Sequence, residues 1–236
     1  MPPGDSEPTV ELVRHAPLKS RTQSLGVYER VRKAILAGAM RPGAKLRIQE
    51  ICERHGVSNG AVREALSKLT SDGLVTAEPH KGFRVTPVSK AALADLTFAR
   101  IEIESICLKQ AIGAGDVDWE SGLLASFHRL SNIPERDADS FSGLSDRWAA
   151  AHAEFHQSLV RACPNQTLLK LRAALYDESE RYRRLSLPIG ASERDVLGEH
   201  QGLMRAAINR DPRIADLMRA HLTKTMDMVL QTLIQT

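Results

Sequence analysis

The chain has 236 residues, which is room for one large or two modest domains, and a net charge of +3. No stretch approaches the roughly 18 apolar residues of a membrane span, and no early apolar run resembles a signal peptide, so we expect no membrane partner. The cysteines Cys52, Cys107 and Cys163 are odd in number, lack CxxC spacing and lie among apolar residues. They are typical of buried thiols in a reducing compartment rather than of a disulfide framework, which predicts a cytoplasmic protein.

The charge is divided unevenly along the chain. Residues 1–90 carry 15 Lys and Arg against 9 Asp and Glu, whereas residues 91–236 carry 17 against 20. A basic first third joined to a mildly acidic remainder indicates that only the first part meets a polyanion. A random partition of charge is the alternative, because a difference of this size does not firmly exclude it.

The first helices follow a proline-rich beginning. Residues 1–23 contain four prolines and scattered charge without hydrophobic periodicity, which predicts a flexible N-terminal arm. From Ser24, apolar residues at spacings of three and four predict a helix that stops at Gly38. A turn at residues 42–43 follows, and a second short helix covers about residues 48–54.

The next stretch, GVSNGAVREALSKL at residues 56–69, predicts a helix with two distinct faces. Its buried face follows the i, i+3, i+4, i+7 pattern, and Ser58 stands at the N-cap position. The opposite face carries small, hydrogen-bonding or cationic side chains: Asn59, Gly60, Arg63, Ser67 and Lys68. Such a helix can enter a DNA major groove about 12 Å wide and place an Arg or Asn against base edges, although other surface helices share this composition.

Three helices in close succession, the second and third joined by a short turn with glycine, form the outline of a helix-turn-helix. After a turn at residues 71–73, the β-prone segments 74–77 and 83–85 flank a turn at residues 79–82. This pattern predicts a small β-hairpin with a basic tip. It would be the wing of a winged helix-turn-helix domain that spans residues 24–87.

The segments AILAG, RPGAKL, GVSNGAVREALSKL, DGLV and KGFRV resemble, in this order, the winged-helix domain of GntR-type bacterial regulators. The resemblance implies binding to double-stranded DNA at a palindromic operator. The contacts that it implies come from Gln49, Ser58, Gly60, Ala61, Arg63, His80, Lys81 and Gly82. Family members usually carry Arg where this chain has Asn59, which adds Asn59 to the candidate contacts. Because an Asn amide prefers adenine whereas Arg prefers guanine, the operator can differ from the common family half-site.

The second domain, residues 88–236, begins with a predicted helix at about residues 89–113. Arg100 and Glu104 fall on the apolar side of this helix, which is unusual for charged residues. They form an internal ion pair one turn apart or, on the alternative interpretation, Arg100 points into a pocket and binds the carboxylate of a ligand.

Further helices are predicted at about residues 118–132 and 139–163, after a cap at Ser192, and after Asp211-Pro212. Four of the eight histidines lie on the apolar faces of three of these helices: His152, His156, His200 and His221. A lone buried histidine is usually a hydrogen-bonded core residue, but independent histidines would rarely align in this way. The pattern therefore favours one shared divalent ion, Zn²⁺ or alternatively Ni²⁺, because imidazole suits both.

Residues from Ala91 onward resemble the FCD effector domain of the FadR subfamily, an all-helical bundle. The matching features are Arg100 with Glu104, Phe155-His156, Asn165, His200 and His221. The resemblance implies a homodimeric repressor whose effector, a small organic acid, binds at the metal beside Arg100. Metal-binding members typically offer one Asp and three His, and the Asp position is His152 here. The length of the domain is closer to the VanR-type branch, and its histidine pattern is similar to that of CsiR-type repressors.

The predicted fold is therefore mainly α, with the winged helix-turn-helix followed by an all-α antiparallel bundle of six to seven helices. Two other functions stay open. One is a DNA-binding dimer whose bundle only dimerises and whose histidines are structural. The other is a metal-dependent hydrolase or deaminase, but Ala153 occupies the general-base position of an H-E-x-x-H motif and Glu154 is expected to face away from the histidine pair.

Overall fold

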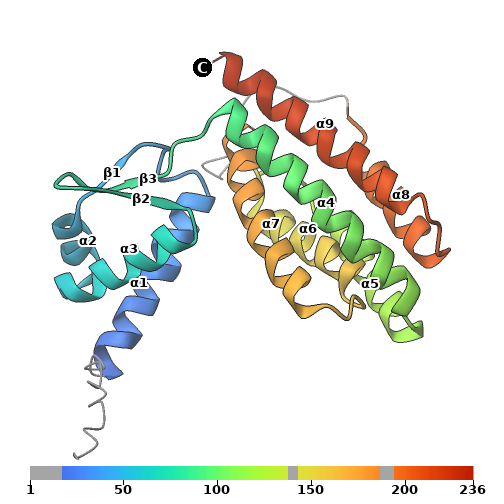
Figure 1. Ribbon diagram of the computed structural model, residues 1–236, viewed down its shortest axis with the longest axis horizontal. Coiled ribbons are helices and arrows are strands. Elements are labelled where there is room, and N and C mark those ends of the chain that lie inside the picture. The colour runs from blue at the N-terminus through green and yellow to red at the C-terminus, as the bar shows by residue number, and fades with distance from the viewer. Residues whose placement is uncertain (1–17, 138–142, 187–193, 236) are drawn as a thin grey trace, which may run out of the picture.

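The computed structural model describes residues 18–137, 143–186 and 194–235, which form two parts (Figure 1). The N-terminal part is a winged helix-turn-helix and the C-terminal part is an all-helical bundle, which confirms the predicted fold class. The predicted arm at residues 1–23 lies outside the described residues except for residues 18–23. Within the described ranges, no helix combines the length and the apolar character that crossing a bilayer requires.

Three helices and a small sheet make up the N-terminal part. They are α1 (Leu18–Leu36), α2 (Ile48–His55), α3 (Asn59–Ser71), β1 (Lys45–Leu46), β2 (Val75–Glu78) and β3 (Gly82–Val85). The sheet is antiparallel in the order β1-β3-β2, with Lys45 opposite Arg84 and Val75 opposite Val85. One core, in which α3 buries Val62, Leu66 and Leu69, joins the helices to the sheet. Its formation places the opposite face of α3 at the surface.

Two features of this part differ from the prediction. Helix α1 begins at Leu18 rather than Ser24, because the periodic pattern marks only the stretch of the helix that packs against the core. Strand β1 was not predicted, since two residues become a strand only by pairing with β3. The predicted N-cap is confirmed: Ser58 Oγ accepts the backbone N–H of Ala61 at 3.3 Å.

Six helices form the C-terminal part as far as the structure describes it, within the predicted range. They are α4 (Lys90–Ala114), α5 (Val117–Ser131), α6 (Asp146–Val160), α7 (Gln166–Ser186), α8 (Val196–Ile208) and α9 (Ile214–Gln235). Helix α4 packs against α7 and α9, and α5 packs against α6 and α8. Helix α7 was not delimited from the sequence, because its buried side includes the charged residues Arg172, Arg181 and Arg183.

Three helix starts in the bundle differ from the prediction. Helix α6 begins at Asp146 rather than 139, with Ser145 Oγ accepting the N–H of Trp148. Helix α8 is capped by Asp195, whose Oδ1 accepts the N–H of Gly198 at 2.8 Å, whereas the predicted cap Ser192 lies outside the described residues. Helix α9 begins at Ile214, after a turn in which Asp211 accepts the N–H of Arg213. In both α6 and α8 the capping side chain belongs to the residue immediately before the first helical residue.

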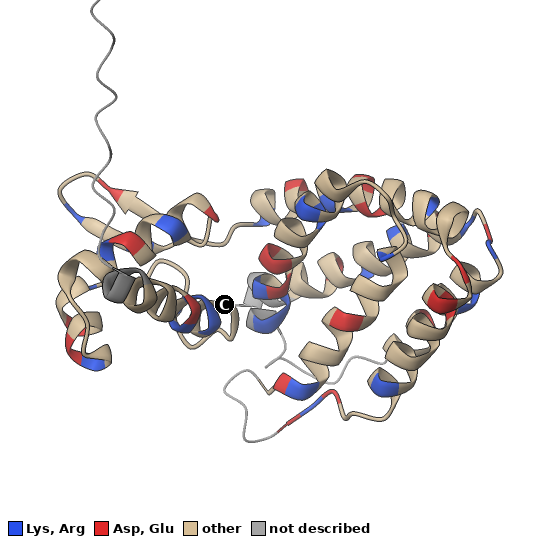
Figure 2. Cartoon of the chain, turned by 90° about the horizontal axis from the view of Figure 1, so that it is seen from below, with Lys and Arg blue, Asp and Glu red and all other residues tan. Residues whose placement is uncertain are grey.

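The two parts contact each other through α1 and α7. Arg32 on α1 forms an ion pair with Asp177 on α7, and Arg181 on α7 donates to the carbonyl of Thr86 in the connecting segment. The start of α4 and the end of α9 lie at the end of the bundle nearest the winged-helix part (Figures 1 and 2). Figure 2 shows basic and acidic residues on both parts. The uneven division of charge along the sequence therefore does not place positive charge on one part and negative charge on the other.

Removal of a large core ring should destabilise the bundle strongly. Phe155 is fully buried and lies against Phe127 and His200, so Phe155→Ala should lower the free energy of unfolding by about 3–5 kcal/mol. Urea denaturation followed by far-UV circular dichroism measures the change. Phe98→Ala is the matched control, because Phe98 is 67% exposed and its removal should stay within about 0.5 kcal/mol. Equal losses in both variants would contradict the placement of Phe155.

Candidate metal centre and nucleic-acid interface

Four histidine side chains from three helices meet inside the bundle. His152 and His156 stand one turn apart on α6, His200 lies on α8 and His221 on α9. All four are buried, and each offers one ring nitrogen to a set whose members lie within 4.8 Å of one another. The structure therefore brings together all four of the predicted metal ligands.

The spacing of these nitrogens suits a small metal ion. Nε2 of His156 lies 3.2 Å from Nε2 of His152 and 3.2 Å from Nε2 of His200. In a tetrahedral site with Zn–N bonds of about 2.0–2.1 Å, ligand nitrogens stand roughly 3.3–3.4 Å apart. The remaining ring nitrogen of His156 has no hydrogen-bond partner among the described residues. The donor set is consistent with a divalent ion.

Burial keeps these rings in the form that binds metal. Desolvation is the largest cause that lowers the pKa of His152, His156 and His200 well below the ordinary value for histidine. Desolvation also lowers the pKa of His221, while its hydrogen bond to Glu199 acts in the opposite direction. Neutral imidazole has an unprotonated nitrogen for coordination, so the cluster is prepared as a ligand set at neutral pH.

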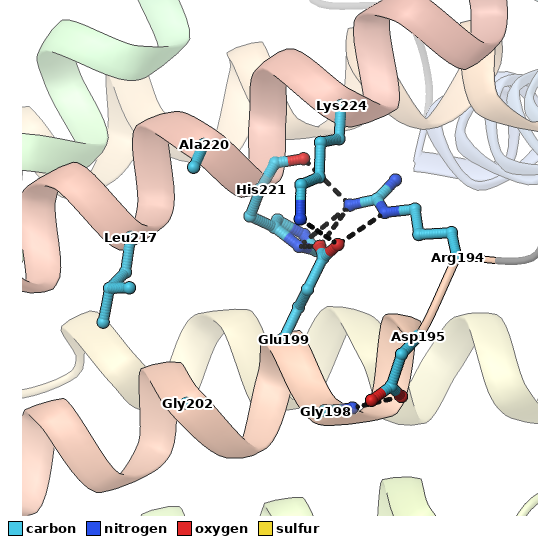
Figure 3. Close-up of a pocket in the computed structure, with 9 residues that line it drawn as sticks. All are labelled: Arg194, Asp195, Gly198, Glu199, Gly202, Leu217, Ala220, His221 and Lys224. Atoms are coloured by element: carbon cyan, nitrogen blue, oxygen red, sulfur yellow. Dashed lines mark hydrogen bonds and ion pairs between the residues drawn. The ribbon is translucent and has the colours of Figure 1, made fainter.

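Two of the rings are held by polar residues that the sequence did not single out. His152 Nδ1 lies 2.9 Å from the hydroxyl of Tyr176 on α7, and its ring stacks on Trp148 at 4.6 Å between centroids. His221 Nδ1 lies 2.8 Å from Glu199 Oε2 (Figure 3). No periodic pattern could have identified Tyr176 or Glu199, because their partners are on other helices.

The buried Arg100 is near the cluster but is not the main partner of Glu104. Arg172 on α7 donates through Nε to both carboxylate oxygens of Glu104, at 3.0 and 3.1 Å. Arg100 Nε lies 3.5 Å from Glu104 Oε1, without hydrogen-bond geometry to any described atom. The Arg100 guanidinium also lies 4.8 Å from the ring centroid of Tyr176. Both sequence interpretations thus have support: the ion pair exists, and Arg100 retains an unused donor in the interior.

Most candidate DNA contacts lie on the surface of the winged-helix part. Exposed members of the set are Gln49, Ser58, Asn59, Gly60, Arg63, His80, Lys81 and Gly82. Ala61 is fully buried, and its side chain therefore faces the core rather than the groove. The wing tip turns sharply, with left-handed backbone at His80 (φ +61°) and Gly82 (φ +90°), which leaves Lys81 projecting from the hairpin.

The enzymatic interpretation has no support in the geometry. Glu154 pairs with Arg129 on α5 at 2.5 Å, and both side chains are substantially exposed. Its carboxylate therefore does not serve as a base beside the histidine cluster.

A winged helix-turn-helix joined to a helical bundle with a buried histidine cluster defines a two-part DNA-binding regulator. Residues 23–85 match the model described as "Bacterial regulatory proteins, gntR family", and residues 95–224 match that of the FCD domain. The chain therefore belongs to the GntR family of bacterial regulatory proteins and carries an FCD domain. It is a transcriptional regulator and not an enzyme.

Individual relatives agree with this assignment. The chain is 36% identical over 205 residues to BphR, an uncharacterized HTH-type transcriptional regulator of Paraburkholderia xenovorans, covering 86% of this chain and 84% of that protein. It is 34% identical over 216 residues to the HTH-type transcriptional repressor GlaR of Escherichia coli, covering 89% and 97%. A solved structure of a putative GntR regulator from Rhodococcus has the same fold, with a TM-score of 0.71 at 21% identity over 89% of this chain and 98% of that one.

The metal-free protein should lose stability in mild acid. The unfolded histidines titrate near pH 6.5, whereas the folded pKa values are lower, so the unfolded state binds more protons below about pH 6.5. The free energy of unfolding should therefore fall between about pH 7 and 5, by up to about 1.4 kcal/mol per pH unit for each histidine. Urea unfolding with excess chelator measures this slope. His200→Gln should flatten this slope, and a slope equal to that of the wild type in this variant would contradict the assignment.

Proposed function

We propose that this protein is a cytoplasmic repressor that binds a palindromic operator as a homodimer and leaves it when a small carboxylic acid binds in the bundle. In this proposal the four-histidine cluster holds a divalent ion, Zn²⁺ or alternatively Ni²⁺, at which the acid binds. Within the family we place the chain in the VanR-type branch, near the CsiR-type repressors. The observation that carries the proposal is the convergence of His152, His156, His200 and His221 in one buried volume beside Arg100.

The chemistry of the cluster favours an anionic effector. Four neutral imidazoles would leave the full +2 charge of a bound divalent ion uncompensated in a low-dielectric interior. Arg100 adds a further cation whose Nε has no hydrogen-bond partner among the described residues. A carboxylate that occupies this space would offset the charge and accept a charge-assisted hydrogen bond from Arg100.

Helix α7 supplies a physical connection between this site and the DNA-binding part. Tyr176 on α7 contacts His152, and the next residue, Asp177, pairs with Arg32 on α1. One turn further along α7, Arg181 donates to the carbonyl of Thr86. An effector that displaces α7 would therefore change the position of the winged-helix part relative to the bundle. If the effector binds one of these two arrangements more tightly, it shifts the protein toward that arrangement and so changes the affinity for DNA.

DNA binding is proposed to use the exposed face of α3 and the wing. Arg63 and Asn59 lie on the surface at the start of α3, where side chains of a recognition helix reach base edges. Lys81 at the tip of the wing is placed to contact phosphate. The thiol of Cys52 donates to Asn59 Oδ1 at 3.3 Å, which restrains the orientation of that amide.

Arg63 should contribute to sequence recognition and Lys81 to general DNA affinity. Arg63→Ala should weaken binding to an operator selected from a random-sequence library by about 1–3 kcal/mol, because a base contact is lost. Lys81→Ala should weaken binding to all sequences and reduce its salt dependence, because a phosphate contact is lost. Fluorescence anisotropy at several salt concentrations measures both. Unchanged operator affinity of the Arg63 variant at fixed salt would contradict the role of α3.

The purified protein should hold about one divalent ion per chain, because four buried imidazoles each offer one ligand nitrogen within 4.8 Å of the others. Removal with a chelator should lower the melting temperature, and added Zn²⁺ should restore it, since binding only the folded state stabilises that state. The His152→Ala/His221→Ala double variant should lose the ion, as measured by elemental analysis. Full occupancy in that variant would show that the ligands lie elsewhere.

Arg100 and Arg172 should have separable roles. Arg100→Ala should fold and bind metal, yet its affinity for an acid that stabilises the wild type should fall about ten- to a hundredfold, equivalent to about 1.5–3 kcal/mol. Arg172→Ala removes the principal partner of the fully buried Glu104 and should destabilise the bundle by about 3–5 kcal/mol. Thermal melts with a panel of small organic acids test both variants. A normal effector response in Arg100→Ala would favour the alternative, a DNA-binding dimer with a purely structural metal site.

A further inference from the structure

Behind His221 lies a small network of charged residues that opens to the surface between α8 and α9. Glu199 on α8 projects to His221 and Lys224 on α9, and Arg194, just before α8, approaches the same carboxylate (Figure 3). His221 also lines the pocket that these side chains form, and His221 itself is only 6% exposed. Of the four candidate metal ligands, His221 lines this pocket and lies in contact with Glu199.

The hydrogen bond between Glu199 and His221 determines where the imidazole proton lies. Glu199 Oε2 is 2.8 Å from His221 Nδ1, and a carboxylate oxygen at that distance accepts a hydrogen bond. Nδ1 must therefore carry the proton, which leaves Nε2 with its lone pair. Arg194 also approaches Nδ1, but at 3.2 Å, and it donates more closely to Glu199 Oε2 (2.5 Å) and to the His221 carbonyl (2.9 Å).

We propose that Glu199 is a positioning residue for the metal centre: it holds His221 in the Nδ1–H tautomer and so keeps Nε2 available as a ligand. This inference rests on the proposed metal-binding function. It deepens that function by making the four histidines inequivalent. His221 has a carboxylate behind it, His152 has the hydroxyl of Tyr176, and the Nδ1 atom of His156 has no hydrogen-bond partner among the described residues.

A carboxylate behind a ligand histidine has a known effect on metal binding. It fixes the tautomer and the orientation of the ring, and its loss typically costs about ten- to a hundredfold in metal affinity. In this chain the loss of metal affinity should be close to a hundredfold, the upper end of that range. Without Glu199, the Arg194 guanidinium beside Nδ1 can donate to that nitrogen and select the opposite tautomer, whose Nε2 carries a proton and cannot bind metal.

The test compares the wild type with Glu199→Ala, Glu199→Gln and Lys224→Ala. Zn²⁺ affinity is measured by competition with a chromophoric chelator on the full chain. Glu199→Ala should bind about a hundredfold more weakly, and Glu199→Gln should recover part of the loss, because its amide oxygen still accepts from Nδ1. Lys224→Ala is the matched control: Lys224 contacts Glu199 Oε1 but is 59% exposed, and its loss leaves the histidine contact intact. Its Zn²⁺ affinity should equal that of the wild type.

A second measurement needs no metal. Long-range ¹H–¹⁵N spectra of the metal-free protein report the tautomer of each histidine, with His221→Gln providing the assignment. The wild type and Lys224→Ala should show His221 protonated on Nδ1, and Glu199→Ala should show it protonated on Nε2. If Glu199→Ala does not fold, the same comparison is made with Glu199→Gln, which should retain the wild-type tautomer.

The outcomes separate this inference from the proposed function. Tight Zn²⁺ binding in wild type and Glu199→Ala alike, or the same His221 tautomer in both, overturns the role of Glu199 while leaving the metal site intact. Absence of Zn²⁺ binding in the wild type overturns the metal site and, with it, the positioning role. Loss of affinity in Lys224→Ala equal to that in Glu199→Ala would assign the effect to the charge network as a whole and also overturns the inference.

Discussion

Four imidazole rings share one buried volume in the bundle, and the packing of three helices depends on keeping them neutral there. A buried charge without a partner is costly, so desolvation lowers the pKa values of these rings instead. Nitrogens only 3.2 Å apart would repel each other as cations but can face a common ion as neutral ligands. Burial keeps the four rings neutral. Neutral rings avoid the cost of buried charge on folding, and they also have the lone pairs that a metal ion needs.

Around this cluster the bundle concentrates buried positive charge. Arg100, Arg172 and Arg183 are all less than a tenth exposed, and the first two lie near the ring of Tyr176. Glu104 and Glu180 offset part of this charge, with Arg172 bound closely to the former and Arg183 to the latter. Arg100 has the weakest pairing of the three. The interior is thus electrostatically suited to one additional anion, in keeping with an acid as the proposed effector.

Helix α7 has two faces with different tasks. One face carries Arg172 and Tyr176, which contact groups in the bundle interior, and the other carries Asp177, which contacts α1. Because a helix moves largely as a unit, groups on both faces shift together. This arrangement would couple the proposed site inside the bundle to the proposed DNA-binding surface on α3, with which it has no direct contact among the described residues.

Much of this protein was determined by local sequence. The two-faced helix at Asn59–Ser71, the Ser58 cap and the wing follow from periodicity, capping and turn residues, all of which act over a few neighbouring residues. The four histidines could be selected because each sits at an apolar position of its own helix. Boundaries such as the starts of α6 and α8 were predicted less well, since several nearby side chains can cap and only packing selects among them.

Only the tertiary structure decided which side chains stand behind the site. Arg172 is 68 residues from Glu104 in the chain, Tyr176 is 24 from His152 and Glu199 is 22 from His221, so no pattern within one helix relates them. The bounds of helix α7 were not predicted for the same reason. In the sequence its buried arginines resemble solvent-exposed residues, and their burial becomes clear only when their partners on other helices are known. Local sequence determined which faces are apolar and which residue types they present. The partner of each buried polar group depended on how those faces packed together, because hydrogen bonds and charge pairs act over distances that the chain reaches only by folding.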